Sequence, residues 1–419
     1  MDDKDKIEIR ERDANLSKKW YEINKRIPVN NQQYSFDSLA RQEEFVSKQF
    51  SCEADLERFR KYREEWYRRA KELDPCDTPL AVCCELVSTC NLNCTMCYSI
   101  TEEFQESIIG SQRMLPWSIV KSVIDECAAL NVSSMLFSWR GESTIYRSKD
   151  ENGNTIRFHD VLAYARKKGI LEITSLTNGQ ILDDEMIYGI VDAEPNWLSV
   201  SIDGLEKNYN KIRTPANKKG ANYNAFEKVI TNIKNLISYR DKVGKNRPQI
   251  RTNTIYPPIA RDQMAYYSFM KNIGVGWVTV NEILDMRGEE LPNDAIMKNW
   301  VCQYPFQRLT VSSNGCIIPC TGAHNEEDEM VIGRYVGSRQ KEVFLKGKKK
   351  VFDYKEMMLK EAWVSEKLEK IRTIHKEGRR TEIFACKHCR HGAVKHGPTW
   401  IPEDWNMETM EWEGGSWRE

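Results

Sequence analysis

The sequence has no long hydrophobic runs, no excess of charge of either sign and no internal repeats. No apolar run approaches the roughly 18 residues of a membrane-spanning helix, and segment 1–6 is almost wholly charged, so we expect neither a membrane span nor a secretory signal. Lysine plus arginine and aspartate plus glutamate are balanced at 62 each. This balance argues against bulk electrostatic binding to nucleic acid or anionic membranes. We therefore expect a cytoplasmic protein with neither a membrane nor a nucleic acid as its partner.

Cysteine is abundant instead, at 13 of the 419 residues. Because cytoplasmic proteins rarely keep disulfides, these cysteines do not predict a disulfide framework. A compact first group consists of Cys90, Cys94 and Cys97. A second group occupies the last third of the chain and consists of Cys302, Cys316, Cys320, Cys386 and Cys389. The others lie in apolar or helical stretches, where a free cysteine usually behaves as a small buried hydrophobic residue.

The first 78 residues are rich in charge, and their apolar side chains recur at helical spacing over 36–73. We interpret this region as amphipathic helices that form a scaffold or lid without chemistry of their own. From residue 79, short apolar runs alternate with helical patterns. The expected strands are 80–87, 134–139, 171–177, 197–202, 249–256 and 277–283, and the expected helices are 118–130, 159–168, 183–191, 225–237 and 262–272.

Strands that alternate with helices predict right-handed crossovers and a parallel sheet, and therefore an α/β fold. Six such units are too few for a closed eight-stranded barrel and suit an open, partial (β/α)6 barrel. We expect the chemistry at the carboxyl ends of the strands, where parallel α/β folds place their sites.

After residue 283 the alternation stops. The turn dipeptide Asn314-Gly315 predicts a hairpin over 309–318, and a helical stretch follows over 354–375. The tail contains four tryptophans, Trp400, Trp405, Trp412 and Trp417, and we expect at least 400–405 to pack on the folded chain. The predicted organisation is a helical extension over 1–78, a partial barrel over 79–290 and a C-terminal domain with its tail over 291–419.

The first cysteine group has the spacing C-x3-C-x2-C and follows directly on the first expected strand. Three thiolates in such a loop can hold one face of a [4Fe–4S] cluster, because iron–sulfur clusters take soft thiolate ligands. Three ligands leave one iron open. A structural zinc site is the alternative, but it usually needs four ligands with paired spacing.

This loop resembles that of the radical S-adenosylmethionine (SAM) superfamily, and the resemblance covers about residues 80–285. It implies that Cys90, Cys94 and Cys97 are the metal ligands and the catalytic residues. The open iron would bind SAM and cleave it reductively to a 5′-deoxyadenosyl radical, which abstracts hydrogen from a substrate. An electron donor such as flavodoxin or ferredoxin is implied as a partner.

The resemblance also implies a set of SAM contacts at successive strand ends. Arg140-Gly141-Glu142 follows the second strand and resembles the Gly-Gly-Glu motif, whose backbone and carboxylate receive the SAM amino group; Arg140 replaces its first glycine. The other implied contacts are Asn178 after the third strand, Ser201 and Asp203 at the fourth, Arg213 beyond it, and Tyr98 beside the cluster. Tyr98 and Glu282 are also candidates for substrate contact or proton removal.

The second cysteine group resembles the SPASM domain or its shortened twitch form, which binds auxiliary [4Fe–4S] clusters. The resemblance implies one auxiliary cluster held by Cys302, Cys320, Cys386 and Cys389. With four thiolates it would carry an electron rather than bind substrate. A zinc site built from the same cysteines, aided by His388 and His391, is the alternative. For Cys316 we keep three roles open: hydrogen-atom donor, extra ligand or passive residue.

The leading functional hypothesis is a radical SAM oxidoreductase, dehydrogenase-like, that oxidises or remodels a small polyhydroxylated or amino-sugar-like molecule. It follows from the resemblance to family members that oxidise an aminocyclitol. The alternative is a peptide- or protein-modifying maturase that forms thioether or carbon crosslinks or epimerises residues. The all-helical pattern of 1–78 offers no winged-helix peptide-binding module, which counts against the alternative. A non-catalytic iron–sulfur or zinc scaffold is a third hypothesis.

Replacing Cys94 by alanine is expected to abolish 5′-deoxyadenosine formation, because a cluster loop with two thiolates cannot hold the SAM-cleaving cluster. The measurement is 5′-deoxyadenosine released by anaerobically reconstituted protein supplied with SAM and a strong reductant. Reductive cleavage retained by this variant would contradict the central prediction.

Overall fold

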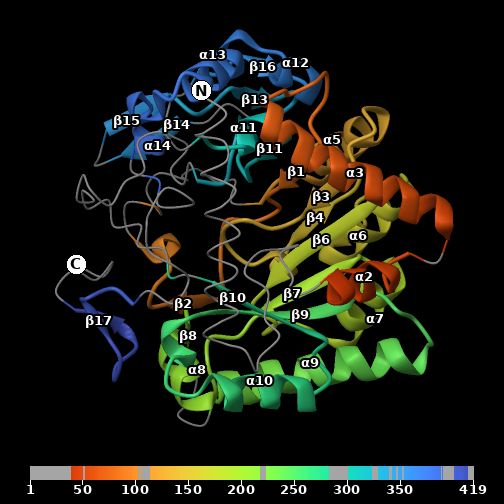
Figure 1. The fold of residues 1–419 in the computed structure, drawn as a ribbon, viewed down its shortest axis with the longest axis vertical. Helices are drawn as coiled ribbons and strands as arrows, with labels where there is room; N and C mark the ends of the chain where they lie inside the picture. Colours follow the sequence, from red (N-terminus) through yellow and green to blue (C-terminus); the bar gives the residue numbers. More distant parts are fainter. Residues whose placement is uncertain are drawn as a thin grey trace.

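The computed structural model describes most of the chain beyond residue 38 (Figure 1). The described residues are 39–50, 52–101, 104, 114–217, 223–281, 283, 301–322, 329–338, 342–345, 348–351, 353–387, 389 and 401–413. The sequence predictions for 1–38, Glu282, His388, His391, Trp400 and Trp417 lie outside these residues.

A run of parallel strands forms the centre of the molecule and confirms the predicted α/β partial barrel. Its strands are β1 (Ala81–Cys84), β3 (Ser134–Leu136), β6 (Glu172–Thr177), β7 (Trp197–Ser201), β9 (Gln249–Ile255) and β10 (Trp277–Asn281). Each of the six expected strands is present, and their neighbours pair in parallel in the order β10-β9-β7-β6-β3-β1. The carboxyl ends of these strands therefore meet at one edge.

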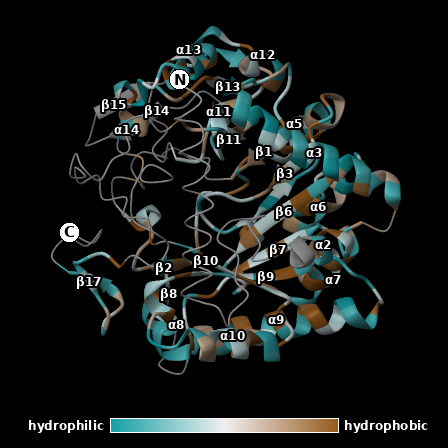
Figure 2. Cartoon of the chain, viewed as in Figure 1, coloured by the Kyte–Doolittle hydropathy of each residue, from teal (hydrophilic) through white to brown (hydrophobic). Residues whose placement is uncertain are grey.

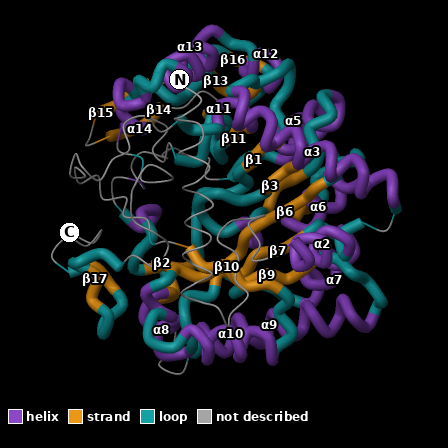
Figure 3. Tube along the Cα trace, in the orientation of Figure 1, coloured by secondary structure: helices purple, strands orange, loops and turns teal. Residues whose placement is uncertain are grey.

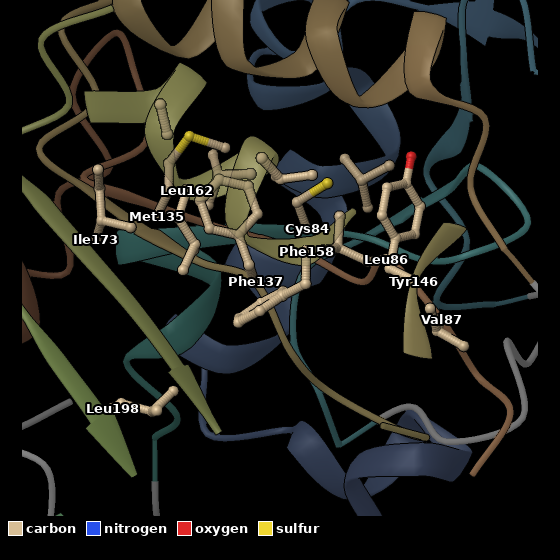
Figure 4. Packing of buried hydrophobic residues seen from close by; sticks show 14 of the residues in the cluster. Cys84, Leu86, Val87, Met135, Phe137, Tyr146, Phe158, Leu162, Ile173 and Leu198 are labelled. Carbon is tan, nitrogen blue, oxygen red and sulfur yellow. The ribbon is translucent and has the colours of Figure 1, made fainter. Parts of the chain in front are cut away.

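Helices cover one side of this sheet, as Figure 3 shows. They are α5 (Trp117–Ala129), α6 (Phe158–Lys167), α7 (Asp184–Ala193), α8 (Glu206–Ile212), α9 (Ala225–Lys242) and α10 (Gln263–Asn272). Because side chains alternate along a strand, every second residue faces these helices. Met135, Ile173 and Leu198 are such residues, and they pack with Phe158 and Leu162 of α6 in the main hydrophobic core (Figure 4). Figure 2 shows the matching amphipathic colouring of α9.

The C-terminal region continues the same sheet. Strand β11 (Arg308–Val311) pairs in parallel with β1, and β12 (Cys316–Ile318) and β13 (Gly333–Tyr335) follow antiparallel. Strand β16 (Glu356–Met357) completes the order at ten strands. The predicted hairpin over 309–318 is confirmed, and Gly315 in its turn has φ +85°, which favours glycine.

One predicted element was wrong. The helix expected over 354–375 is interrupted: strand β16 is followed by α12 (Leu359–Trp363) and then α13 (Glu366–Lys376). The break lies at Ser365, whose side chain accepts a hydrogen bond from the Leu368 amide and so caps α13. Smaller elements complete the region: α11 (Tyr304–Gln307), α14 (Phe384–Lys387), β14 (Glu342–Leu345) and β15 (Lys348–Val351).

The N-terminal helices α2 (Leu39–Ser47) and α3 (Glu53–Glu72) pack at the amino ends of the barrel strands. Phe45 meets Trp277, the first residue of β10, edge to face at 5.0 Å between ring centroids. Trp197, the first residue of β7, belongs to the same cluster. Since the carboxyl ends lie at the opposite edge, these helices are a scaffold under the barrel and not a lid over its site.

Besides the pair of β14 with β15, three short antiparallel pairs were not expected from the sequence. Strand β4 (Arg147–Lys149) pairs with β5 (Thr155–Arg157), and β2 (Leu92–Cys94) pairs with β8 (Arg213–Pro215). The third pair, β17 (Trp405–Asn406) with β18 (Glu411–Trp412), forms a hairpin in the tail. Both of its tryptophans are buried, so the expected packing of the tail is confirmed at Trp405. No helix in the described part of the chain has the length and apolar character needed to cross a bilayer.

A buried carboxyl group on β6 should make stability depend on pH. Burial raises the pKa of Glu172 to about 8, and the nearby guanidinium of Arg251 only partly opposes this. Because the ionised form is favoured in the unfolded chain, stability should fall as pH rises from about 4.5 to about 8, by a few kcal/mol. Glu172→Gln is expected to flatten this dependence in denaturant unfolding at pH 5 and pH 8. The exposed Glu185→Gln is the control, and an unchanged pH dependence in Glu172→Gln would contradict the expectation.

Candidate cluster and SAM site

The cysteine loop is held by the short pair of β2 and β8, which places Arg213 directly opposite Cys94. The Arg213 Nη1 lies 3.8 Å from the Cys94 Sγ. Asp203 fixes this guanidinium, since its Oδ2 accepts from Nε at 2.8 Å and lies 2.7 Å from Nη2. Its Oδ1 accepts from the Ile255 amide at 3.0 Å. Burial alone would lower the pKa of Arg213, but the Asp203 carboxylate outweighs this effect and the pKa is raised. The guanidinium therefore stays protonated beside the thiol.

The three cysteines of the loop share one neighbourhood. The Cys97 amide donates to the Cys94 carbonyl at 3.0 Å, so the chain turns back on itself between them. The Asn178 Nδ2 lies 3.7 Å from the Cys90 Sγ. Burial, then the Glu142 carboxylate and the Cys97 thiol, raise the pKa of Cys90 to about 12. Two predicted SAM contacts, Asn178 and Glu142, therefore lie beside the predicted cluster ligands.

Hydrogen-bond donors from two segments of the chain hold both oxygens of the Glu142 carboxylate in place. Its Oε1 accepts from the amide and hydroxyl of Thr144 at 3.0 and 2.7 Å and from the Thr177 hydroxyl at 2.6 Å. Its Oε2 accepts from the Asn178 amide at 2.6 Å. A carboxylate so held is a fixed negative charge with acceptor capacity left on Oε2.

The turn that carries Glu142 requires glycine at position 141. Gly141 has φ +65°, and a Cβ there would lie 2.6 Å from backbone atoms of Val87, Ser88 and Thr89. No side chain could be accommodated without moving the segment that leads into Cys90. The Glu142 amide donates to the Thr89 carbonyl at 2.9 Å, so this turn and the cysteine loop are joined.

Arg140, which replaces the first glycine of the motif, turns into the interior and forms an ion pair with Glu85. Its Nε and Nη2 lie 2.8 and 2.6 Å from the two Glu85 oxygens. Both side chains are buried, and the Ser313 amide of the β11–β12 hairpin also donates to Glu85 at 2.8 Å. Arginine at position 140, where the motif has glycine, therefore links the turn 140–142 to the C-terminal region. Gly141 and Glu142 keep their places in this turn.

Trp139, the neighbouring residue, makes a second link. Its indole Nε1 donates to the Thr321 carbonyl at 3.0 Å, and the Arg140 guanidinium stacks 3.8 Å from its ring centroid. Thr321 directly follows Cys320, a predicted ligand of the auxiliary cluster. One turn of the barrel thus contacts both candidate cluster regions.

The four predicted auxiliary ligands also share one neighbourhood. A Cβ on Gly322 would lie 3.4 Å from the Cys320 Sγ and 4.0 Å from the Cys389 Sγ. Cys386 interacts electrostatically with Cys302, Cys320 and Cys389, and burial, its largest influence, raises its pKa. Cys316 lies instead on β12 in the main hydrophobic core, which favours the passive role among those considered.

His375 and Arg380 are residues of this region that sequence reasoning missed. His375 is buried. Its Nε2 lies 3.5 Å from the Cys386 Sγ, and its Nδ1 accepts from the Cys302 amide at 3.4 Å. Burial lowers the pKa of His375 to about 4, so the ring is neutral and its remaining proton faces the sulfur. Arg380, also buried, donates to the Cys386 carbonyl. The regular spacing of buried residues on α13 was the available signal for His375.

Two other predicted residues lie at the rim of the barrel. Ser201 ends β7 and is aligned with Asn253 on β9. Tyr98 lies in a short 3-10 turn after the cysteine loop, edge-on to Phe104 at 5.1 Å between ring centroids.

Among the described residues, no group of three or more His, Cys, Asp or Glu side chains is close enough together to hold a single metal ion. The structure contains instead two neighbourhoods of cysteine, one of three and one of four thiols. Thiolates in these numbers are the donors that iron–sulfur clusters use, so the residues fit such groups.

Comparison with known families agrees with this geometry. Residues 85–243 match the radical SAM superfamily, and residues 302–390 match SPASM, an iron–sulfur cluster-binding domain. The chain contains a radical SAM domain followed by a SPASM domain. These two domains imply [4Fe–4S] clusters and SAM as cofactors.

Two curated relatives are about a quarter identical to this chain within the aligned segments. A tungsten-containing aldehyde ferredoxin oxidoreductase cofactor-modifying protein from Pyrococcus furiosus is 24% identical over 56% of this chain and 60% of its own length. The Fe-coproporphyrin III synthase of Methanosarcina barkeri is 27% identical over 54% of this chain and 53% of its own length. The chain thus spans little more than half the length of these relatives.

Among solved structures, native anSMEcpe with bound AdoMet superposes with a TM-score of 0.50. The two chains are 15% identical, and the match covers 77% of this chain and 94% of the other. At this identity the likeness shows the fold alone.

Replacing Cys386 by alanine is expected to remove about four irons per chain, as loss of one cubane requires. The SAM-cleaving cluster should remain, because its predicted ligands are on a separate loop. The measurement is iron content after anaerobic reconstitution. Cys316→Ala is the matched control, since it removes a thiol of the same region that packs in the core. Equal iron in Cys386→Ala and the parent protein would refute the auxiliary site.

Proposed function

We propose that this protein cleaves SAM reductively and removes a hydrogen atom from a small polyhydroxylated or amino-sugar-like molecule bound inside the partial barrel, in an overall oxidation or remodelling. The observation that carries the substrate class is the polar, hydrogen-bonding inner wall of β7, β9 and β10. The side chains that share this face are Ser199, Ser201, Arg251, Asn253, Thr279 and Asn281.

The neutral groups on this wall are suited to hydroxyl and amine partners. The Asn281 Nδ2 donates to the Asn253 Oδ1 at 2.5 Å. The Asn281 Oδ1 and the Asn253 Nδ2 are then left on the same face for other partners. The hydroxyls of Ser199 and Thr279 are buried and make no hydrogen bond with any described residue. A buried hydroxyl without a partner costs free energy, so a bound polar molecule would stabilise it.

The charged groups near this wall are already engaged. Arg251 interacts electrostatically with Glu172 and lies over the Trp197 ring at 4.4 Å from its centroid. Arg213 is paired with Asp203. The recognition surface that remains is therefore made of hydroxyl and amide groups, which favours a hydroxylated substrate over a strongly ionic one.

The cofactor contacts would be divided among residues already placed. Cys90, Cys94 and Cys97 would hold the cluster that SAM meets, and Glu142 would take the SAM amino group, beside Asn178. Such a cluster would supply the electron for reductive cleavage of SAM, and a second cluster held by four thiolates would supply electron transfer. Arg213 would hold positive charge close to the Cys94 thiolate, fixed by Asp203.

The names of the curated relatives do not agree on a substrate. One is named for modifying a cofactor, another for the synthesis of Fe-coproporphyrin III and a third for maturing a sulfatase. Modification of a peptide or protein is therefore the alternative to the small-molecule proposal. The experiment that separates them adds fractions of a host extract, separated by size, to the enzyme. Acceleration of 5′-deoxyadenosine release by the small polar fraction supports the proposal, and acceleration by the peptide or protein fraction alone refutes it.

The inner wall can be tested with a pair of isosteric substitutions. Thr279→Val removes a buried hydroxyl from the inner face, and Thr252→Val removes one from the outer face of the neighbouring strand. We expect Thr279→Val to lower the substrate-dependent rate of 5′-deoxyadenosine release about five-fold or more, from loss of one hydrogen bond. Substrate-independent SAM cleavage should be unchanged in both variants. Equal rates in the two variants with the stimulating fraction would contradict the role of the wall.

A further inference from the structure

The tryptophan-containing hairpin of the tail, 401–413, lies beyond both family matches, which end at residues 243 and 390. It nevertheless returns to the cysteine loop. Figure 1 shows β17 beside β2 and β8, the two strands that hold this loop. The hairpin is thus a feature of this chain that the shared fold and the proposed chemistry do not account for.

One buried hydrogen bond joins the hairpin to the loop. The Thr95 Oγ1 donates to the Met410 carbonyl at 2.8 Å. Thr95 follows Cys94 directly, and its amide donates to the Ile212 carbonyl at 3.0 Å. The residue between two predicted cluster ligands is therefore fixed by its backbone on one side and by the hairpin through its side chain.

Apolar contact reinforces this bond. Trp405 and Trp412 pair across the hairpin edge to face, with ring centroids 5.1 Å apart. Together with Met410 they are buried against Ile212, and Met96 of the cysteine loop packs on the same cluster. Burial of aromatic rings of this size is the larger part of the docking free energy.

The polar contacts at the rim contribute less. Arg261 and Glu408 form an ion pair at 2.6 Å, but both side chains are about two-thirds exposed, at 65% and 68%. Pairs of this kind are screened by solvent and usually contribute less than about 1 kcal/mol. Lys211 also donates to the Glu408 carbonyl at the surface.

We propose that this hairpin is a strap that positions the loop carrying Cys94 and Cys97 and so retains the cluster bound there. Thr95 and Trp412 are its positioning residues. The backbone of Cys94 is paired with β8 on one side of the loop, and the strap holds Thr95 and Met96 on the other. A loop clamped from two sides keeps its thiols in place when one iron bond opens, so rebinding is faster than loss. The strap acts on cluster retention, whatever the substrate is.

The test compares two clusters in the same molecules. Full-length protein is reconstituted anaerobically without substrate and exposed to an iron chelator, and loss of each cluster is followed by electron paramagnetic resonance. The SAM-cleaving cluster is identified by the change that SAM makes in its signal. The auxiliary cluster is an internal reference, because the described contacts of the strap are with the barrel and the cysteine loop.

Thr95→Val is expected to speed loss of the SAM-cleaving cluster about five-fold, as removal of one buried hydrogen bond implies. Thr95→Ser, which keeps the hydroxyl, should match the parent protein. Trp412→Ala should have a larger effect than Thr95→Val, and Trp66→Ala, which removes a tryptophan of α3 at the far end of the barrel, should have none.

Two results would overturn the proposal. If both clusters are lost faster to the same degree, the variants have weakened the fold as a whole. If neither rate changes in Thr95→Val, the strap does not position the loop. The proposed function fails on a different readout, substrate-dependent release of 5′-deoxyadenosine, so the two failures can be told apart.

Discussion

Strand β1 has parallel partners on both sides, β3 in the barrel and β11 in the C-terminal region, and this pairing determines how the molecule is organised. A strand paired on both sides has no free edge, so the barrel and the cluster-binding region become one sheet. The cysteine loop leaves the carboxyl end of β1, and the β11–β12 hairpin leads to Cys320. Both candidate cluster regions are thereby attached to the same strand.

Two buried ion pairs lie beside strands of this sheet, Glu85 with Arg140 and Asp203 with Arg213. Removing one member of such a pair leaves an uncompensated buried charge and is usually strongly destabilising. The pairing also removes ionic groups from the recognition surface, so hydroxyl and amide groups dominate the inner wall. Fold stability and the proposed substrate preference therefore have a common electrostatic origin.

The sequence was sufficient for those features that leave a local pattern. The six barrel strands and five of their helices were predictable because apolar residues repeat with the period of each element, as in Trp277–Asn281 and Ala225–Lys242. The cysteine groups were predictable from spacing. The interruption of the helix over 354–375 was not, because the apolar spacing of 359–363 and 366–376 is helical in both pieces and only the Ser365 cap separates them.

Other parts of the site depend on contacts between distant segments. Arg213 was predicted as a SAM contact, but its pairing opposite Cys94 comes from a ladder of two three-residue strands, too short to leave a sequence signal. His375 looked isolated because Cys302 and Cys386, its neighbours in space, lie 73 and 11 residues away. The role of Arg140 also needed the structure, since Glu85 lies 55 residues earlier, directly after β1.

The strap has a consequence for how the protein is made. Thr95 and Met410 are separated by 315 residues in the chain. At the roughly 5–20 residues per second of synthesis, the cysteine loop leaves the ribosome on the order of 15 to 60 seconds before the segment that covers it. During that interval the cysteine loop can fold against β8, but it lacks the contacts that Met410 and the two hairpin tryptophans make. The strap is therefore among the last contacts that the growing chain can form.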